Sequence, residues 1–339
     1  SKNNQATPFI LQLKQGWNMV AAPYPFTINW DDVLEYNANP AVGDYHVFNG
    51  TGYAASNSLE AWKGGFVYAD AAINLTIPVV FPPSGGRKNL REQFTALPGE
   101  GNWLLPLTLK QGTFENTLTG FGMHEEAEES KDRFDAVSLP RFIEYVDLTT
   151  TRPESFSPYF MRDVVSPQPQ YVWRFTLDAS GKEPVTLQWN HESIQQSKAQ
   201  LLLYDAQAAR LVDMRTQGEY TVPNASNRQL QFIFSTDELH GSNSELGKAY
   251  PNPFTKEVNL PAYLHTSNGQ ATVIVNIINP AGIVVYRQIR TTSSKELMQP
   301  VWNGTDQSGN RVAPGVYIYK VIFTSNKRSY LHQGKLIKL

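Results

Sequence analysis

Short runs in which apolar and polar residues alternate recur along the chain, and glycine, proline and asparagine residues separate them. In residues 171–177 the alternation places Tyr171, Trp173, Phe175 and Leu177 on one face. Residues 185–189 alternate likewise, and further strands are predicted at residues 200–204, 219–222 and 230–234. Alternation with period two is typical of half-buried strands, and strands spaced about 10–15 residues apart are typical of a β-sandwich.

The first part of the chain shows the same pattern, with one helical exception. Strands are predicted at residues 9–13, 17–21, 45–48 and 64–69, and the Asn-Gly pair at 49–50 predicts a hairpin turn. Asn29 precedes a short segment that opens with acidic residues, which favours a helix capped at Asn29 or Asp31. The Pro-Pro-Ser-Gly-Gly segment at 82–86 predicts a loop or a domain boundary.

The pattern as a whole predicts an all-β protein built from tandem β-sandwich domains. Residues 1–95 are expected to form a β-rich accessory domain, and residues 96–240 a sandwich of the jelly-roll or fibronectin kind. Residues 236–249 are polar and have no periodicity, which is typical of a linker. After this linker, short strands and turns in residues 244–339 predict an immunoglobulin-like sandwich.

Five motifs follow one another in the C-terminal region. They are Tyr-Pro-Asn-Pro-Phe at 250–254, Asn-Pro-Ala-Gly at 279–282, Trp-Asn-Gly-Thr-Asp-Gln-Ser-Gly at 302–309, Pro-Gly-Val-Tyr-Ile-Tyr at 314–319 and Gly-Lys-Leu-Ile at 334–337. In this order and spacing they resemble the type A C-terminal sorting domain of the type IX secretion system. The pattern is also similar to the immunoglobulin-like domain of flagellar hook-capping proteins.

The resemblance to the sorting domain implies a place and a set of partners. It implies export through the outer membrane of a Gram-negative bacterium to the cell surface. The implied partners are an outer-membrane shuttle or translocon and a sortase, and lipopolysaccharide is a further expected partner. The residues implied in recognition are Pro251, Asn252, Pro253, Phe254, Gly315, Tyr317 and Lys335. A sortase is expected to cut within residues 236–249.

Charge is distributed unevenly over the three predicted domains. Residues 244–339 hold 11 Lys and Arg against 4 Asp and Glu, a net charge of +7, whereas residues 96–243 have a net charge of −8. A basic end is compatible with contact with phosphates or with an acidic protein face, but a solvated surface is the favoured interpretation. Nucleic acid is not among the expected partners.

One acidic cluster lies in the middle of the chain. Carboxylates in loops bind hard cations, so a calcium site is considered at Glu125, Glu126, Glu128, Glu129, Asp132 and Asp135. The spacing is not that of an EF-hand, and a solvated acidic loop is the favoured interpretation. No other cofactor is expected.

Signatures of catalysis are missing from the sequence. There is no cysteine, no Gly-x-Ser-x-Gly elbow, no phosphate-binding loop and no histidine pair at metal-binding spacing. Together with the resemblance of the C-terminal region to a sorting domain, this favours interpreting the chain as the non-catalytic C-terminal part of a secreted cell-surface protein. Two alternatives stay open: the tail of a peptidase or glycosidase whose catalytic domain lies upstream, and an adhesin or a subunit of a surface assembly.

Overall fold

The protein was analysed as a computed structural model, which describes residues 7–80, 94–141, 144–205, 207–208, 210–236, 239–241, 249–260, 262–265, 271–292, 297–325 and 328–339. Strands and one short helix account for the regular structure of these residues, which confirms the all-β prediction. The chain divides into two compact units: Ser1–Pro167 with Phe175–Ser193 and Gly218–Asn227, and Gln168–Arg174 with Ile194–Gln217 and Arg228–Leu339. The limits of the three predicted domains stay predictions, and the loop predicted at residues 82–86 lies outside the described residues.

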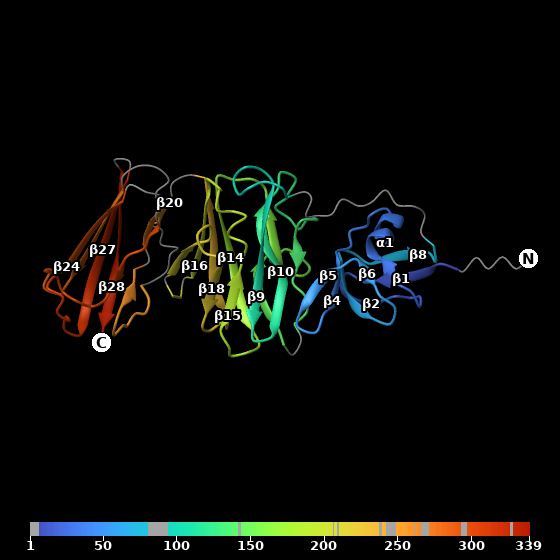
Figure 1. The fold of residues 1–339 in the computed structure, drawn as a ribbon, viewed down its shortest axis with the longest axis horizontal. Helices are drawn as coiled ribbons and strands as arrows, with labels where there is room; N and C mark the ends of the chain where they lie inside the picture. The colour runs from blue at the N-terminus through green and yellow to red at the C-terminus, as the bar shows by residue number, and fades with distance from the viewer. Residues whose placement is uncertain are drawn as a thin grey trace, which may run out of the picture. The chain divides into compact units, whose positions relative to one another are not determined.

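The N-terminal part of the first unit has small antiparallel sheets and one helix (Figure 1). Asn29 caps the helix as expected, because its side-chain oxygen accepts from Asp31 N at 2.8 Å. The sheets are β1–β8, β2–β7–β4–β5 and β3–β6. The elements are β1 (Phe9–Leu13), β2 (Gly16–Ala21), β3 (Ile28–Asn29), α1 (Trp30–Tyr36), β4 (Tyr45–Phe48), β5 (Tyr53–Ser56), β6 (Ser58–Leu59), β7 (Gly64–Ala69) and β8 (Ile73–Ile77).

The rest of the first unit is a larger sheet in the order β14–β12–β13–β10–β9–β15–β18, with β11 beside β13. Its strands pair antiparallel, except that β10 and β13 are parallel. The strands are β9 (Trp103–Gln111), β10 (Phe114–Met123), β11 (Ala136–Val137), β12 (Val146–Thr151), β13 (Tyr159–Val165), β14 (Gln170–Ala179), β15 (Val185–Gln188) and β18 (Glu219–Val222). Alternate residues of β9 are buried, as the period-two pattern requires.

The second unit begins with β17–β16–β19 beside the first half of β14 and continues into the C-terminal sandwich. One sheet of that sandwich has the order β24–β23–β27–β28 (Figure 1, orange to red), and β21–β26 and β20–β22–β25 are two small sheets. The strands are β16 (Gln200–Asp205), β17 (Arg210–Asp213), β19 (Arg228–Ser235), β20 (Leu239–Gly241), β21 (Val258–Asn259), β22 (Tyr263–His265), β23 (Ala271–Ile278), β24 (Val284–Thr292), β25 (Leu297–Met298), β26 (Val301–Trp302), β27 (Gly315–Ser325) and β28 (Arg328–Lys338).

The predicted linker is therefore not irregular throughout. Residues 239–241 form β20, which pairs with β22 of the C-terminal sandwich. Backbone pairing at a sheet edge needs no apolar periodicity, which explains why the polar sequence concealed this strand. The cleavage expected in the linker falls largely on residues 237–238 and 242–248, which lie outside the described residues.

Candidate functional site

The segment 250–254 lies against the last strand of the chain, β28. The side chain of Asn252 donates from Nδ2 to the carbonyl oxygen of Lys335 at 2.9 Å and accepts at Oδ1 from the N–H of Ile337 at 2.7 Å. Phe254 continues the contact with its backbone, because its N–H donates to Ile337 O and its carbonyl accepts from Leu339 N, each at 2.9 Å. Together these four hydrogen bonds join residues 252–254 to the C-terminal end of β28, and we call them the clasp.

The side chain of Phe254 enters the core of the C-terminal sandwich. It is buried, and its ring centroid lies 5.3 Å from that of Trp302, which in turn lies 5.3 Å from Tyr317 in an edge-to-face arrangement. Both polar ends are satisfied: Trp302 Nε1 donates to Thr305 O at 2.9 Å, and the Tyr317 hydroxyl donates to Ala313 O at 2.7 Å. The predicted residues Phe254 and Tyr317 therefore meet through Trp302, which sequence reasoning had quoted only as part of a motif.

Glycine is required at two positions next to this aromatic cluster. Gly315 begins β27 with φ of +154°, a conformation that side chains disfavour, although a Cβ there would have open space. Gly304 has φ of +75°, and a Cβ would come within 3.0 Å of Lys338 and 3.2 Å of Phe254. Gly315 is therefore required by its backbone conformation alone, and Gly304 by both its backbone conformation and close packing.

The two lysines of the last strand differ in their surroundings. Lys335 is exposed, and its carbonyl group, rather than its side chain, contacts Asn252. Lys338 is buried, with Nζ donating to Leu339 O at 3.2 Å and lying 6.0 Å from the centroid of the Phe254 ring. Sequence reasoning missed Lys338, because nothing in its neighbourhood distinguishes it from the lysine three residues earlier.

A second aromatic contact lies farther along β27 and β28. Tyr319 faces Gly334 across the two strands, and a Cβ on Gly334 would come within 2.5 Å of the tyrosine hydroxyl oxygen. The same hydroxyl lies 3.1 Å from His332 Nε2. Burial raises the pKa of Tyr319 to about 12 and lowers that of His332, so both groups are neutral at physiological pH.

The residues considered for calcium differ in their surroundings. Glu125, Glu126, Glu128 and Glu129 are exposed. Glu126 forms an ion pair with Arg133, and the carboxylate of Asp132 accepts from the N–H groups of Glu128 and Phe134, each at 2.7 Å. Asp135 is buried, and its carboxylate accepts from Arg152 and from the N–H groups of Asp132 and Val164.

Asp135 belongs to a buried cluster in which two carboxylates share one guanidinium. Arg152 Nη1 lies 2.9 Å from Asp135, and its Nη2 pairs with Asp163. Burial raises the pKa of Asp135 to about 7 and raises that of Asp163, although Arg152 opposes both shifts. Within the described ranges no three His, Asp or Glu side chains are grouped to hold a metal ion, and the calcium site stays a prediction.

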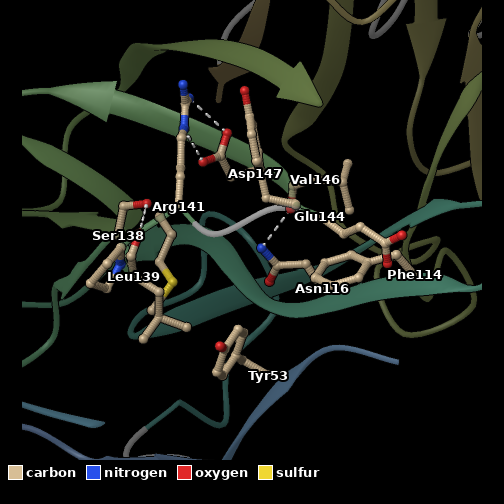
Figure 2. A pocket seen from close by; sticks show the side chains of 12 residues that line it. Tyr53, Phe114, Asn116, Ser138, Leu139, Arg141, Glu144, Val146 and Asp147 are labelled. Atoms are coloured by element: carbon tan, nitrogen blue, oxygen red, sulfur yellow. Dashed lines mark hydrogen bonds and ion pairs between the residues drawn. The ribbon is translucent and has the colours of Figure 1, made fainter. Parts of the chain in front are cut away.

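One cavity in the first unit is shown in Figure 2. Its lining includes Tyr53, Asn116, Arg141 and Asp147, and its volume is about 30 Å³. The guanidinium of Arg141 donates two hydrogen bonds to the carboxylate of Asp147, from Nε to Oδ2 at 2.8 Å and from Nη2 to Oδ1 at 3.0 Å. Such a volume holds one or two water molecules, whereas pockets for small ligands measure about 300–1,000 Å³.

Comparison with known proteins gives few matches. No family model and no curated protein matches the chain. Among solved structures, dimeric latent PorU from Porphyromonas gingivalis has 12% sequence identity and a TM-score of 0.25 over 70% of this chain and 30% of its own. PorZ, a surface component of the type IX secretion system of the same bacterium, has 18% identity and a TM-score of 0.19 over 57% and 25%. The chain thus spans less than a third of either structure, and at these TM-scores the similarity establishes no shared fold.

None of the helices in the described residues has the length and apolar character needed to cross a membrane.

Proposed function

We propose that the C-terminal sandwich is a non-catalytic recognition domain that directs type IX secretion and surface attachment of a larger protein. The observation that carries the proposal is the convergence of residues picked from separate motifs. Asn252 and Phe254 form hydrogen bonds with β28, the strand that contains Lys335. The rings of Phe254 and Tyr317 both pack against Trp302. A recognition signal needs such a fixed surface, and these motifs lie more than eighty residues apart in the chain.

The core of this domain is formed by its own residues, which supports a self-contained module. The buried cluster around Phe254 and Trp302 draws its members from residues 249–336. A module of this kind presents its surface independently of the protein that it is attached to. Its expected partners are an outer-membrane shuttle or translocon, a sortase and lipopolysaccharide, and its expected location is the surface of a Gram-negative bacterium.

The same proposal assigns no reaction centre to this chain. The strongly shifted carboxyl group, Asp135, is bound by Arg152 and a backbone N–H rather than exposed in a cleft. Asp147, one of the two carboxylates that line the cavity of Figure 2, is likewise held by Arg141. A catalytic acid or base must reach a substrate proton, and these two are occupied by guanidinium groups.

The proposal is tested by transport. Residues 239–339, which include β20, are fused behind a folded reporter in a host with a type IX system, and the reporter on intact cells is measured by its accessibility to added protease. Lys335→Ala removes an exposed side chain of the site and leaves the carbonyl group that binds Asn252. Lys256→Ala, which removes an exposed lysine outside the site, is the matched control.

We expect the fusion and its Lys256→Ala form to reach the surface and the Lys335→Ala form to accumulate inside the cell. Retention of the unaltered fusion in the periplasm would refute the proposed function. Equal export of all three forms would remove Lys335 from the recognition residues and leave transport by the domain intact.

A further inference from the structure

One face of the C-terminal sheet β24–β23–β27–β28 packs against the core, and the other is not covered by any described element. The strand registers align the outward side chains in rows that cross the sheet. Ile289, Ile274, Ile322 and Leu331 form one such row, since each lies opposite the next in the pairings of the four strands. Ile289 is 57% exposed and Leu331 is 54% exposed.

The neighbouring rows follow the same register. A polar row contains Arg287, Asn276, Lys320 and Gln333, and a second apolar row contains Val284, Ile278 and Ile318 and ends at Lys335. On the far side of the first apolar row lies a row of hydroxyl groups. In that row the hydroxyl oxygens of Thr272 and Thr291 are 3.1 Å apart, and those of Thr324 and Ser329 are 3.0 Å apart. The outward face therefore alternates apolar and polar rows about 7 Å apart, the spacing of residues i and i+2 in a strand.

The charge of this face has one sign. Arg287, Lys320 and Lys335 project from it, and none of the described outward residues of the four strands is acidic. No ion pair involves these three cations in the part of the chain that the structure describes. A contiguous exposed apolar patch with fixed charge of one sign is typical of an interaction surface.

We propose that this face is the docking surface for an acidic protein partner whose own surface carries apolar rows at matching spacing. A second copy of the chain does not fit, because a two-fold contact would place the three cations against themselves. A lipid surface does not fit either, since the basic row lies between the two apolar rows. Burying both apolar rows in hydrocarbon would bury Arg287 and Lys320 as well.

The size of the face predicts a transient contact. The four strands lie about 4.8 Å apart, and the four rows together extend about 20 Å along the strands. With the surrounding side chains, the face offers a surface of roughly 500 Å² to a partner. Stable interfaces bury about 800 Å² on each side, and smaller ones are typical of weak or transient encounters. The expected dissociation constant is therefore micromolar, and it should rise with salt because charge pairs at an interface are screened.

The inference goes beyond the proposed function and is tested by binding in solution rather than by transport. The full chain is titrated with a disulfide-closed β-hairpin peptide in which one face has a glutamate row between two valine rows. The matched probe replaces glutamate by lysine. Fluorescence anisotropy of the labelled peptide reports binding, and sedimentation velocity of the chain alone reports self-association.

Two variants keep the test specific for the face. Lys320→Glu reverses a charge on β27, an interior strand, so it leaves both edges of the sheet unaltered. Leu331→Ser removes an exposed apolar side chain from β28. Lys256→Glu is the control charge reversal, because Lys256 lies in the same domain outside the four strands.

We expect micromolar binding of the glutamate hairpin, at least tenfold weaker binding by each face variant and no change with Lys256→Glu. The inference is overturned by equal binding of the glutamate and lysine hairpins, by the absence of binding at millimolar peptide, or by face variants that bind like the unaltered chain. Binding of the chain to anionic phospholipid vesicles but not to the hairpin, or self-association abolished by Lys320→Glu, would overturn it too.

Discussion

The clasp makes the amide of Ile337 a sensitive reporter of Asn252. Its N–H donates to the Asn252 side chain at 2.7 Å, and the same side chain donates to Lys335 O at 2.9 Å. A net contribution of about 0.5–1.5 kcal/mol is typical of a hydrogen bond in a folded protein. The bond to Ile337 is partly buried, whereas water can replace the bond to Lys335. We therefore expect Asn252→Ala to weaken the clasp by about 1.5 kcal/mol.

Hydrogen exchange measured at single amides translates this energy into a rate. Since 1.4 kcal/mol corresponds to a factor of ten, exchange of the Ile337 amide should be about tenfold faster in Asn252→Ala. Leu336 is the internal control, because backbone groups alternate in direction along a strand and its N–H points toward β27. Its exchange should change much less.

Asn252→Asp adds a second condition to the same experiment. The carboxylate can still accept from Ile337 N but opposes the carbonyl oxygen of Lys335, so at neutral pH it should loosen the clasp at least as much as alanine does. Below the carboxyl pKa the protonated side chain regains a donor, and part of the protection should return. Unchanged exchange at Ile337, or equal acceleration along the whole of β28, would refute the assigned role of Asn252.

Three further outcomes follow from the packing and the charges. Phe254→Ala removes a buried ring and should cost about 3–5 kcal/mol, visible as faster exchange of the core amides of β23, whereas Phe254→Leu should cost less. Gly315→Ala should lower the midpoint of thermal unfolding of the C-terminal sandwich through backbone strain of about 1–3 kcal/mol, and an unchanged midpoint would contradict that strain. Burial raises the pKa of Asp135 to about 7 in the folded chain, above the ordinary carboxyl value of about 4. Between these two pH values the folded state therefore keeps this carboxyl group protonated while the unfolded state releases the proton. Its contribution to stability should thus fall as pH rises from about 4 through 7, and the loss of stability between pH 5.5 and pH 8 should be smaller in Asp135→Asn than in the unaltered chain.

Local patterns in the sequence predicted much of the secondary structure. Asn29 caps α1, the Asn-Gly pair joins β4 and β5, and alternation marks β14 and β15. The parallel pairing of β10 with β13 was not predicted, because it joins segments that are distant in the sequence and no turn motif announces it. Strand β20 was missed because its residues carry no apolar period.

In the candidate site, too, local motifs could be predicted from the sequence, whereas long-range contacts could not. The motif around Phe254 could be recognised as a unit, but its partner in the structure, Ile337, lies more than eighty residues away and is chosen by strand register. In the acidic cluster, sequence reasoning treated Asp132 and Asp135 as equivalent to the neighbouring glutamates. Short aspartate side chains reach backbone N–H groups in tight turns. Asp132 accepts from the N–H groups of Glu128 and Phe134, and Asp135 accepts from that of Asp132, whereas the glutamate side chains are exposed.

The clasp also determines how the C-terminal sandwich responds to mechanical load. Phe254 forms a parallel bridge with Lys338 of β28. Tension applied toward the N-terminus at Tyr250 and toward the C-terminus at Leu339 therefore acts along both residues 250–254 and β28. The hydrogen bonds between them are then stretched together instead of opening one after another, as they would in an antiparallel hairpin pulled apart at its ends. A domain held at these two points therefore resists extension by shear of this contact.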